Sequence, residues 1–212
     1  MPKAEEIKSA IQILVEGNDP RNFFEAFIEH LALANIQIQN FGGVSELSSF
    51  LRALVNAPDF QTVQSIGIVR DAETSAERAF QSVQSSLERA RLPMPDNPAE
   101  RTDANPAVTV LILPGDSRQG MLETLLCESF ADTSVDHCID DFFKCVESLP
   151  DASIERSDKA RAHAYLTTKP NPHFSVGVAA KNDYWDLNHS VFSTVRDFLR
   201  MIAAIESPPT TN

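Results

Sequence analysis

Carboxylate side chains follow three of the short apolar segments of this sequence, at the point where each segment ends. They are Glu16, Asp71, Glu73 and Asp116. The carboxyl ends of parallel strands meet at one edge of a sheet, so we expect these carboxylates to gather there. Clustered negative charges oppose one another's ionisation unless a cation offsets them. Because hard oxygen ligands suit Mg²⁺ and Mn²⁺, the pattern predicts a divalent-metal site.

A metal ion held by several carboxylates suits the cleavage of a phosphodiester bond. That reaction needs a water molecule activated near neutral pH and stabilisation of the charge on the departing oxygen, and bound metal ions can supply both. Glu16 lies on a different strand from Asp71 and Glu73, so it could carry a proton to or from water or the leaving group. Lys159 and Arg161 are the better candidates for positioning phosphate.

The elements that must position these residues are read from the spacing of apolar side chains, which alternates between two and nearly four. Strand-like segments cover residues 11–15, 36–41, 65–70 and 108–113, and a helical stripe follows each of them. Neighbouring parallel strands need a crossover, so repeated strand–helix units imply a parallel sheet. We therefore predict an α/β fold in which residues 9–130 form a four-stranded, mainly parallel sheet flanked by helices. A mostly helical C-terminal extension over residues 131–206 would pack on this core, and residues 207–212 would form a disordered tail.

The ordered set of motifs at the strand ends resembles a known family. Val15-Glu16-Gly17, the turn Gly42-Gly43 and the acid pair Asp71-Ala72-Glu73 are similar to the motifs of the Toprim domain. That domain occurs in topoisomerases, primases, and OLD-type and recombination-associated nucleases. Residues 120–123 and 178–187 look more specifically like small stand-alone Toprim/OLD-like proteins of unknown function. The resemblance implies a Toprim-like, Rossmann-like core.

The resemblance also implies roles for individual residues. Glu16 matches the glutamate that acts as general acid or base and also contacts metal, while Asp71 and Glu73 match the pair that holds Mg²⁺ or Mn²⁺. Glu123 looks like a further acid of the OLD-like branch. The sequence departs from the common Asp-x-Asp pattern by placing glutamate at position 73, which changes the reach of that ligand.

The candidate substrate-binding residues are glycines of the loops after the first two strands and two basic side chains. They are Gly17, Gly42, Gly43, Lys159 and Arg161. The tyrosines lie in the later segment, so a covalent topoisomerase mechanism is not supported.

The net charge of the chain limits which kinds of partner it can bind. The 212 residues contain 18 Lys and Arg against 30 Asp and Glu, which gives a net charge of -12. This argues against a polybasic nucleic-acid binder and against adhesion to anionic membranes. No apolar run approaches the roughly 20 residues of a bilayer span, and the first residues lack a signal-peptide pattern. We expect a cytoplasmic protein.

The cysteines show no zinc-site spacing. Cys138 and Cys145 are seven residues apart on one predicted helix, and together with Cys127 they are expected to be reduced core thiols.

Two functional hypotheses follow from the sequence. The first is a metal-dependent, Toprim/OLD-like nuclease that hydrolyses nucleic acid. The alternative is a non-catalytic Toprim-like module that binds metal or phosphate and acts through a partner protein, for which an ATPase is the candidate. The net charge of -12 favours the alternative. A receiver-like phosphoacceptor domain centred on Asp71 ranks last, because the first strand is followed by Glu16 without an adjacent second acid.

Overall fold

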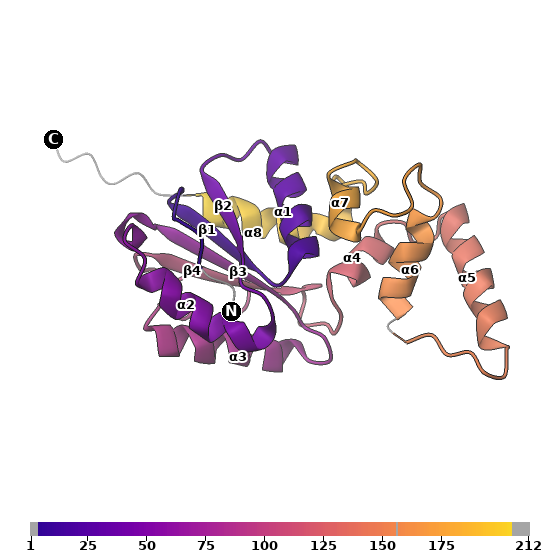
Figure 1. The fold of residues 1–212 in the computed structure, drawn as a ribbon, viewed down its shortest axis with the longest axis horizontal. Helices are drawn as coiled ribbons and strands as arrows, with labels where there is room; N and C mark the ends of the chain where they lie inside the picture. Colours follow the sequence, from indigo (N-terminus) through magenta and orange to yellow (C-terminus); the bar gives the residue numbers. More distant parts are fainter. Residues whose placement is uncertain (1–3, 156, 205–212) are drawn as a thin grey trace.

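The computed structural model describes residues 4–155 and 157–204. Its centre is a four-stranded sheet in the order β2-β1-β3-β4, and all neighbouring strands are parallel. The strands are β1 Ile11–Val15, β2 Ile36–Asn40, β3 Ser65–Asp71 and β4 Ala107–Leu113. The predicted α/β class, with a parallel sheet flanked by helices, is confirmed (Figure 1). The predicted tail, residues 207–212, lies outside the described residues.

Helices cover both faces of the sheet. The helices α1 Asn18–His30 and α8 Ser193–Ala203 lie on one face, and α2 Leu47–Val55 and α3 Ala76–Ala90 lie on the other (Figure 1). Successive side chains of a strand point to opposite faces, so Ile13 and Val15 join the core under α1 and α8 while Leu14 joins the core under α2 and α3. Both faces of the sheet are therefore covered by helices, and β1 is buried along its whole length.

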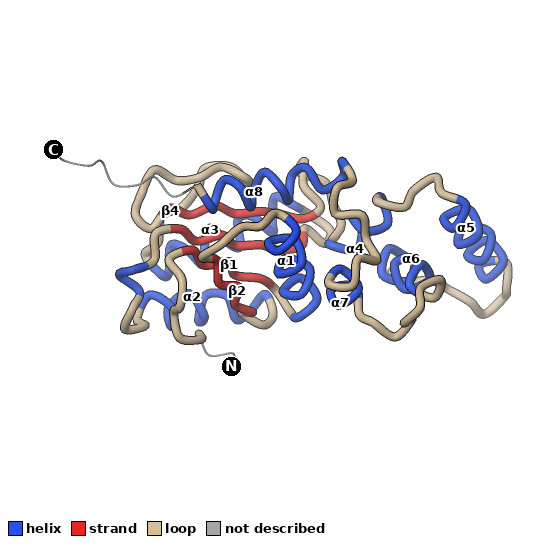
Figure 2. The backbone as a smooth tube through the Cα atoms, turned by 90° about the horizontal axis from the view of Figure 1, so that it is seen from above, coloured by secondary structure: helices blue, strands red, loops and turns tan. Residues whose placement is uncertain are grey.

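The later chain forms helices beyond the carboxyl ends of the strands. They are α4 Leu122–Glu128, α5 Ser134–Glu147, α6 Ser157–Leu166 and α7 Val176–Ala180. Figure 2 shows α5 as the helix farthest from the sheet, with α6 between it and the core. Short 3-10 turns, η1 Val44–Glu46, η2 Phe60–Thr62 and η3 Ser190–Phe192, complete the elements. After the extension, the chain returns to the sheet as α8, which packs against β3 and β4.

A stack of three aromatic rings joins these later helices to the core. The Tyr165 ring lies 4.2 Å from the Phe130 ring and 4.9 Å from the Trp185 ring, measured between centroids. The indole Nε1–H of Trp185 donates to the carbonyl oxygen of Val176 at 2.9 Å. Phe130 and Trp185 are buried and Tyr165 is partly buried, and all three belong to the cluster that lies under α1 and α8, so these helices and the sheet share one core.

The expectation of core thiols is wrong for two of the cysteines. Cys138 and Cys145 are exposed on α5, and Cys127 is half-buried. The spacing placed them correctly on one helix, but the buried apolar side chains of α5 are Ile139 and Phe143, not the cysteines. Burial, aided by the charge of Asp158, raises the pKa of the Cys127 thiol to about 12. Among residues 4–155 and 157–204, no helix is both long enough and apolar enough to cross a bilayer.

The contact between β3 and α8 has no room for a side chain at Gly67. A Cβ atom built there would lie 2.7 Å from Cζ of Phe198. Gly67→Ala should therefore push α8 from the sheet and lower the free energy of unfolding by about 1–3 kcal/mol in urea titration. The matched control is Gly43→Ala, because that position has an ordinary backbone and nothing within 4 Å of an added Cβ. Equal stability of the two variants would contradict the close packing of α8.

Candidate functional site

A polar pocket of about 350 Å³ opens at the carboxyl ends of β1 and β3. It is lined by Glu16, Gly17, Asn18, Asp19, Pro20, Gly42, Asp71, Glu73, Leu122, Glu123 and Lys159. The structure thus gathers candidates from four parts of the chain: the loops after β1, β2 and β3, and the later helices. This is the edge at which open parallel sheets place their ligands.

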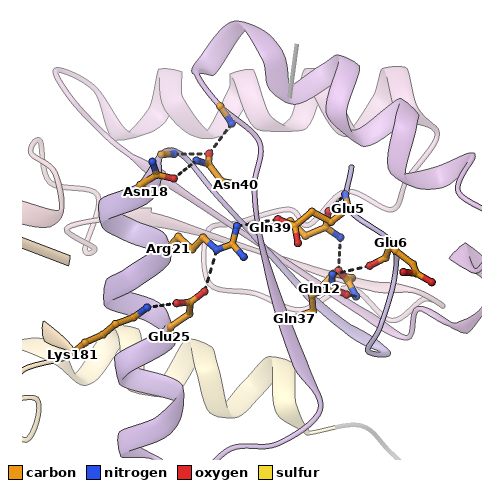
Figure 3. A network of polar contacts seen from close by, with 12 residues as sticks. Glu5, Glu6, Gln12, Asn18, Arg21, Glu25, Gln37, Gln39, Asn40 and Lys181 are labelled. Carbon is orange, nitrogen blue, oxygen red and sulfur yellow. Dashed lines mark hydrogen bonds and ion pairs between the residues drawn. The ribbon is translucent and has the colours of Figure 1, made fainter. Parts of the chain in front are cut away.

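One amide side chain, that of Asn40, joins the loops after β1 and β2 (Figure 3). Its Oδ1 accepts hydrogen bonds from the backbone N–H groups of Gly17, at 2.9 Å, and Gly42, at 2.8 Å. Its Nδ2 donates to Oδ1 of Asn18 at 3.0 Å. Gly17 and Gly42 therefore shape the pocket wall, but both of their N–H groups are already used. Asn40 was not predicted from the sequence; its signal was a polar amide at the end of a strand, two residues before Gly42-Gly43.

The loop after β3 is held against the start of α4. The backbone N–H of Glu73 donates to the oxygen of Gly120 at 2.8 Å, and the N–H of Gly120 donates to the oxygen of Glu73 at 2.9 Å. The N–H of Leu122 donates to Oδ1 of Asp71 at 3.0 Å. Gly120 has a φ of 130°, and an added Cβ would lie 2.5 Å from Oγ1 of Thr124, so only glycine fits here. This pairing brings the acids after β3 next to Glu123.

The start of α6 brings a positive charge to the pocket. Oγ1 of Thr124 on α4 donates to Oδ2 of Asp158 at 2.6 Å, which fixes the first turn of α6. Lys159 follows, and its Nζ lies 3.6 Å from Oε1 of Glu123. The Glu123 side chain is 11% exposed and that of Lys159 is 41% exposed, so the lysine reaches from solvent toward a nearly buried acid.

The carboxylates of the pocket oppose one another's ionisation. Burial is the main cause that raises the pKa of Asp71 to about 7; the charge of Glu123 adds to it, and the hydrogen bond from Leu122 opposes it. Burial also raises the pKa of Glu16; the charge of Glu73 adds to this shift, while the Arg70 guanidinium opposes it. A cation in the pocket would relieve this repulsion.

The donor set fits a hard divalent cation by its chemistry, since it consists of carboxylate oxygens. The residues are Glu16, Asp71, Glu73 and Glu123. In the described part of the chain, however, no three or more His, Cys, Asp or Glu side chains already converge as a metal site. Side-chain rotation toward the pocket would be needed to assemble the ligands.

Three of the predicted site residues lie apart from this set. Asp116 is exposed in the turn after β4, the edge strand, and does not line the pocket. Arg161 points away from the pocket, because its guanidinium pairs with Asp136 and, at 2.5 Å, with Oδ1 of Asp140. Gly43 follows Gly42 but is not part of the pocket lining.

A close contact between α1 and α7 fixes one wall of the pocket. Oδ1 of Asp19 accepts a hydrogen bond from the backbone N–H of Gly177 at 3.1 Å. A Cβ at position 177 would lie only 2.2 Å from the backbone oxygen of Asp19, so the helices approach closely because of this glycine. Nζ of Lys181 also donates to Oδ1 of Asn22 at 2.9 Å and pairs with Glu25 (Figure 3). Nothing local in the sequence signalled this long-range pairing.

The burial of Asp71 predicts a pH-dependent stability in metal-free buffer. The pKa of Asp71 in the folded protein, about 7, exceeds the ordinary value of 3.8 for an aspartate, so the unfolded chain loses this proton first as the pH rises. The free energy of unfolding should fall between about pH 4 and pH 7. Asp71→Asn removes this titration, so the stability of the variant relative to wild type should rise over that range, by about 4 kcal/mol at most. Urea titrations with a chelator at pH 4 and pH 8 measure the difference. A constant difference would contradict the burial of an ionisable group here, and Asp116→Asn, at an exposed site, is the control.

Comparisons with known proteins give a family and several structural likenesses. The model of the family described as "Protein of unknown function (DUF3226)" matches residues 10–204. None of the curated proteins matches this chain. The C-terminal region of the Burkholderia pseudomallei OLD protein is 14% identical, with a TM-score of 0.47, and the likeness covers 92% of this chain and 97% of that one. The C-terminal region of the Xanthomonas campestris pv. campestris OLD protein is 15% identical, with a TM-score of 0.43 and 92% of each chain covered. Since the family model spans nearly the whole chain, this protein belongs to the DUF3226 family.

Proposed function

We propose that this protein is a divalent-metal-dependent phosphotransfer enzyme of the Toprim/OLD-like kind, and that it hydrolyses phosphodiester bonds in nucleic acid. The observation that carries the proposal is the acidic pocket at the carboxyl edge of the sheet. Carboxylates from the ends of β1 and β3 and from the first turn of α4 line one cavity together with a lysine. Burying like charges together costs free energy unless a cation joins them, so a structural role alone does not explain this arrangement.

In this proposal Asp71, Glu73 and Glu123 hold Mg²⁺ or Mn²⁺, with Glu16 as a further contact. Such an ion would stabilise negative charge on the phosphate and promote the ionisation of water. Glu16 reaches the pocket from a separate strand, and burial raises its pKa toward neutral pH. It is therefore the candidate to take a proton from the attacking water or to give one to the leaving oxygen. Asp71 interacts with all three of the other carboxylates, and a bound cation would favour its ionised form.

On the substrate side, Lys159 is the basic residue that reaches the pocket, and we assign it to a phosphate group of the nucleic acid. Gly17 and Gly42 leave the wall free of side chains where the backbone of the substrate would approach. The net charge of -12 gives the chain little general attraction for nucleic acid. We therefore also propose that a partner, such as an ATPase, presents the substrate, and that the protein acts in the cytoplasm.

Metal binding is the first test of the proposal. Calorimetric titration with Mn²⁺ should show binding at about millimolar affinity or tighter for the wild type, as expected for a partly hydrated site of carboxylates. The double variant Asp71→Asn/Glu73→Gln should lose it, because the central ligands become neutral amides. Asp116→Asn is the matched control, since this carboxylate lies outside the pocket and its loss should leave binding unchanged.

The same titration can reject the enzymatic hypothesis, whereas metal binding is compatible with both hypotheses and leaves the decision to the cleavage assays. If the wild type binds neither Mn²⁺ nor Mg²⁺, with or without an added oligonucleotide, the enzymatic proposal fails. The non-catalytic module that acts through a partner protein would then be the better account. The paired charges of Lys159 and Glu123, which already offset part of the acidity, are the structural feature that favours this alternative.

Cleavage assays on single-stranded and duplex oligonucleotides test the roles of the individual residues. Glu16→Gln should lower kcat by about 10²–10⁴, because it removes a proton-transfer group. Lys159→Ala should mainly raise KM for the oligonucleotide and reduce its dependence on salt, as expected for one lost phosphate contact. Lys144→Ala is the control, since Lys144 is an exposed lysine of α5. Unchanged cleavage by Glu16→Gln would remove Glu16 from the mechanism.

A further inference from the structure

Helix α5 carries a wider apolar stripe than its neighbours cover. The stripe consists of Val135, Cys138, Ile139, Phe142, Phe143 and Val146, at the spacing of one helix face. Only Ile139 and Phe143 are buried. Phe142 is 59% exposed, and Leu149, just after the helix, is 55% exposed; these are the two most exposed large apolar side chains in residues 4–155 and 157–204. Exposed apolar side chains gathered in one place are characteristic of an interaction site.

This stripe forms one wall of a groove of about 750 Å³ between α5 and α6. The facing wall on α6 carries Ala160, His163 and Ala164, followed by Thr167 and Thr168, and Ile154 contributes from the connecting loop. Except for His163, the side chains of this wall are short, and together with the large apolar ones of α5 they leave a channel that a third helix can fill. The groove lies at the end of the molecule away from the sheet and is separate from the acidic pocket (Figure 2).

Ion pairs outside the groove set the distance between its two walls. Arg161 of α6 pairs with Asp136 and Asp140 of α5, and its guanidinium lies 5.7 Å from the centre of the Phe143 ring. None of the three charged residues lines the groove. Arg161 therefore holds α5 against α6 on the side away from the groove. The groove stays open although the two helices are tied together.

The charge around the groove indicates what kind of helix would fill it. Residues 131–168, which include α5, α6 and the loop between them, contain eight acidic and four basic side chains. Arg161 pairs with two of these acids, Asp136 and Asp140, and the segment as a whole remains negative. A second copy of this chain would bring the same negative segment, so self-association is disfavoured, as is an anionic membrane. The last described helix, α8, lies along the sheet and away from α5 (Figure 1). A positively charged partner is complementary.

We propose that the groove between α5 and α6 binds an amphipathic helix of a partner protein, with an apolar face and basic flanks. Apolar side chains of that helix, spaced as i, i+3 or i+4, and i+7, enter the groove beside Phe142, while its Lys and Arg residues face the acidic segment. The surface is distinct from the proposed catalytic pocket, so the two proposals stand or fall separately.

The two exposed cysteines of α5 provide a test with an internal control. Cys138 lines the groove, whereas Cys145 is exposed on the same helix outside it. The probe is a synthetic helical peptide of about 18 residues with leucine on one face and lysine elsewhere. Its counterpart has glutamate in place of every lysine. Alkylation of each thiol by iodoacetamide, followed over time and located by mass spectrometry, reports where the peptide binds.

We expect the lysine peptide to slow alkylation of Cys138 by about five-fold or more at saturation, with little change at Cys145, because only the first thiol is covered. The glutamate peptide should protect neither thiol. Phe142→Ala should raise the peptide concentration needed for half-maximal protection of Cys138 by about ten-fold, as expected for the loss of a central aromatic contact. Met94→Ala, which removes an exposed apolar side chain that does not line the groove, should leave the protection of Cys138 unchanged.

Three results would overturn the proposal. Equal protection of both cysteines, or protection by both peptides, would show unspecific coating of α5. Protection of Cys138 that grows with protein concentration in the absence of peptide would show that a second copy fills the groove. Unchanged alkylation of Cys138 at saturating lysine peptide would show that the groove binds no such helix. Circular dichroism of Phe142→Ala verifies that α5 remains folded; Phe142 is largely exposed, so its truncation should not unfold the helix.

Discussion

The site depends on a carboxylate that is half-buried among other carboxylates. Asp71 stands at the end of β3, close to Glu16, Glu73 and Glu123, and its one backbone hydrogen bond comes from the first turn of α4. This single donor does not offset the cost of burying the charge, so the pKa stays raised. The loops, glycines and later helices around this carboxylate can be understood as the means of holding it there.

Two separate parts of the chain make the pocket. The sheet supplies Glu16, Asp71 and the glycine-containing loops, and the later helices supply Glu123 and Lys159. Backbone hydrogen bonds between Glu73 and Gly120 join the loop after β3 to the start of α4. The hydrogen bond from Thr124 to Asp158 joins α4 to α6. The geometry of the acids is therefore coupled to the packing of α4 on α6, and a change in that packing would reach the pocket directly.

Much of the core could be predicted from the sequence, while parts of the site could not. The strands β1 and β4 were visible because both faces of the sheet are covered, which makes them mostly apolar runs. The strand β2 was visible from its alternation of Ile and Gln. The acids after β1 and β3 followed from the positions where those runs end. By contrast, Asn40 binds the backbone N–H of Gly17, and Gly177 binds Asp19, which is far away in the sequence. Side-chain patterns give no signal for such contacts. Asp116 also follows an apolar run, but it is exposed in the turn after β4 and does not line the pocket.

The return of α8 to the sheet has a consequence for the order of folding during synthesis. Residues of α8 pack on β3 and β4, yet they are translated about 80 residues after β4 is complete. At ribosomal rates of roughly 5–20 residues per second, the face of the sheet that α8 covers waits for about 4–16 s without that cover. The nascent chain therefore carries an incomplete core through the synthesis of the whole extension. Ribosome-associated chaperones that shield apolar surface would act on this chain during that interval.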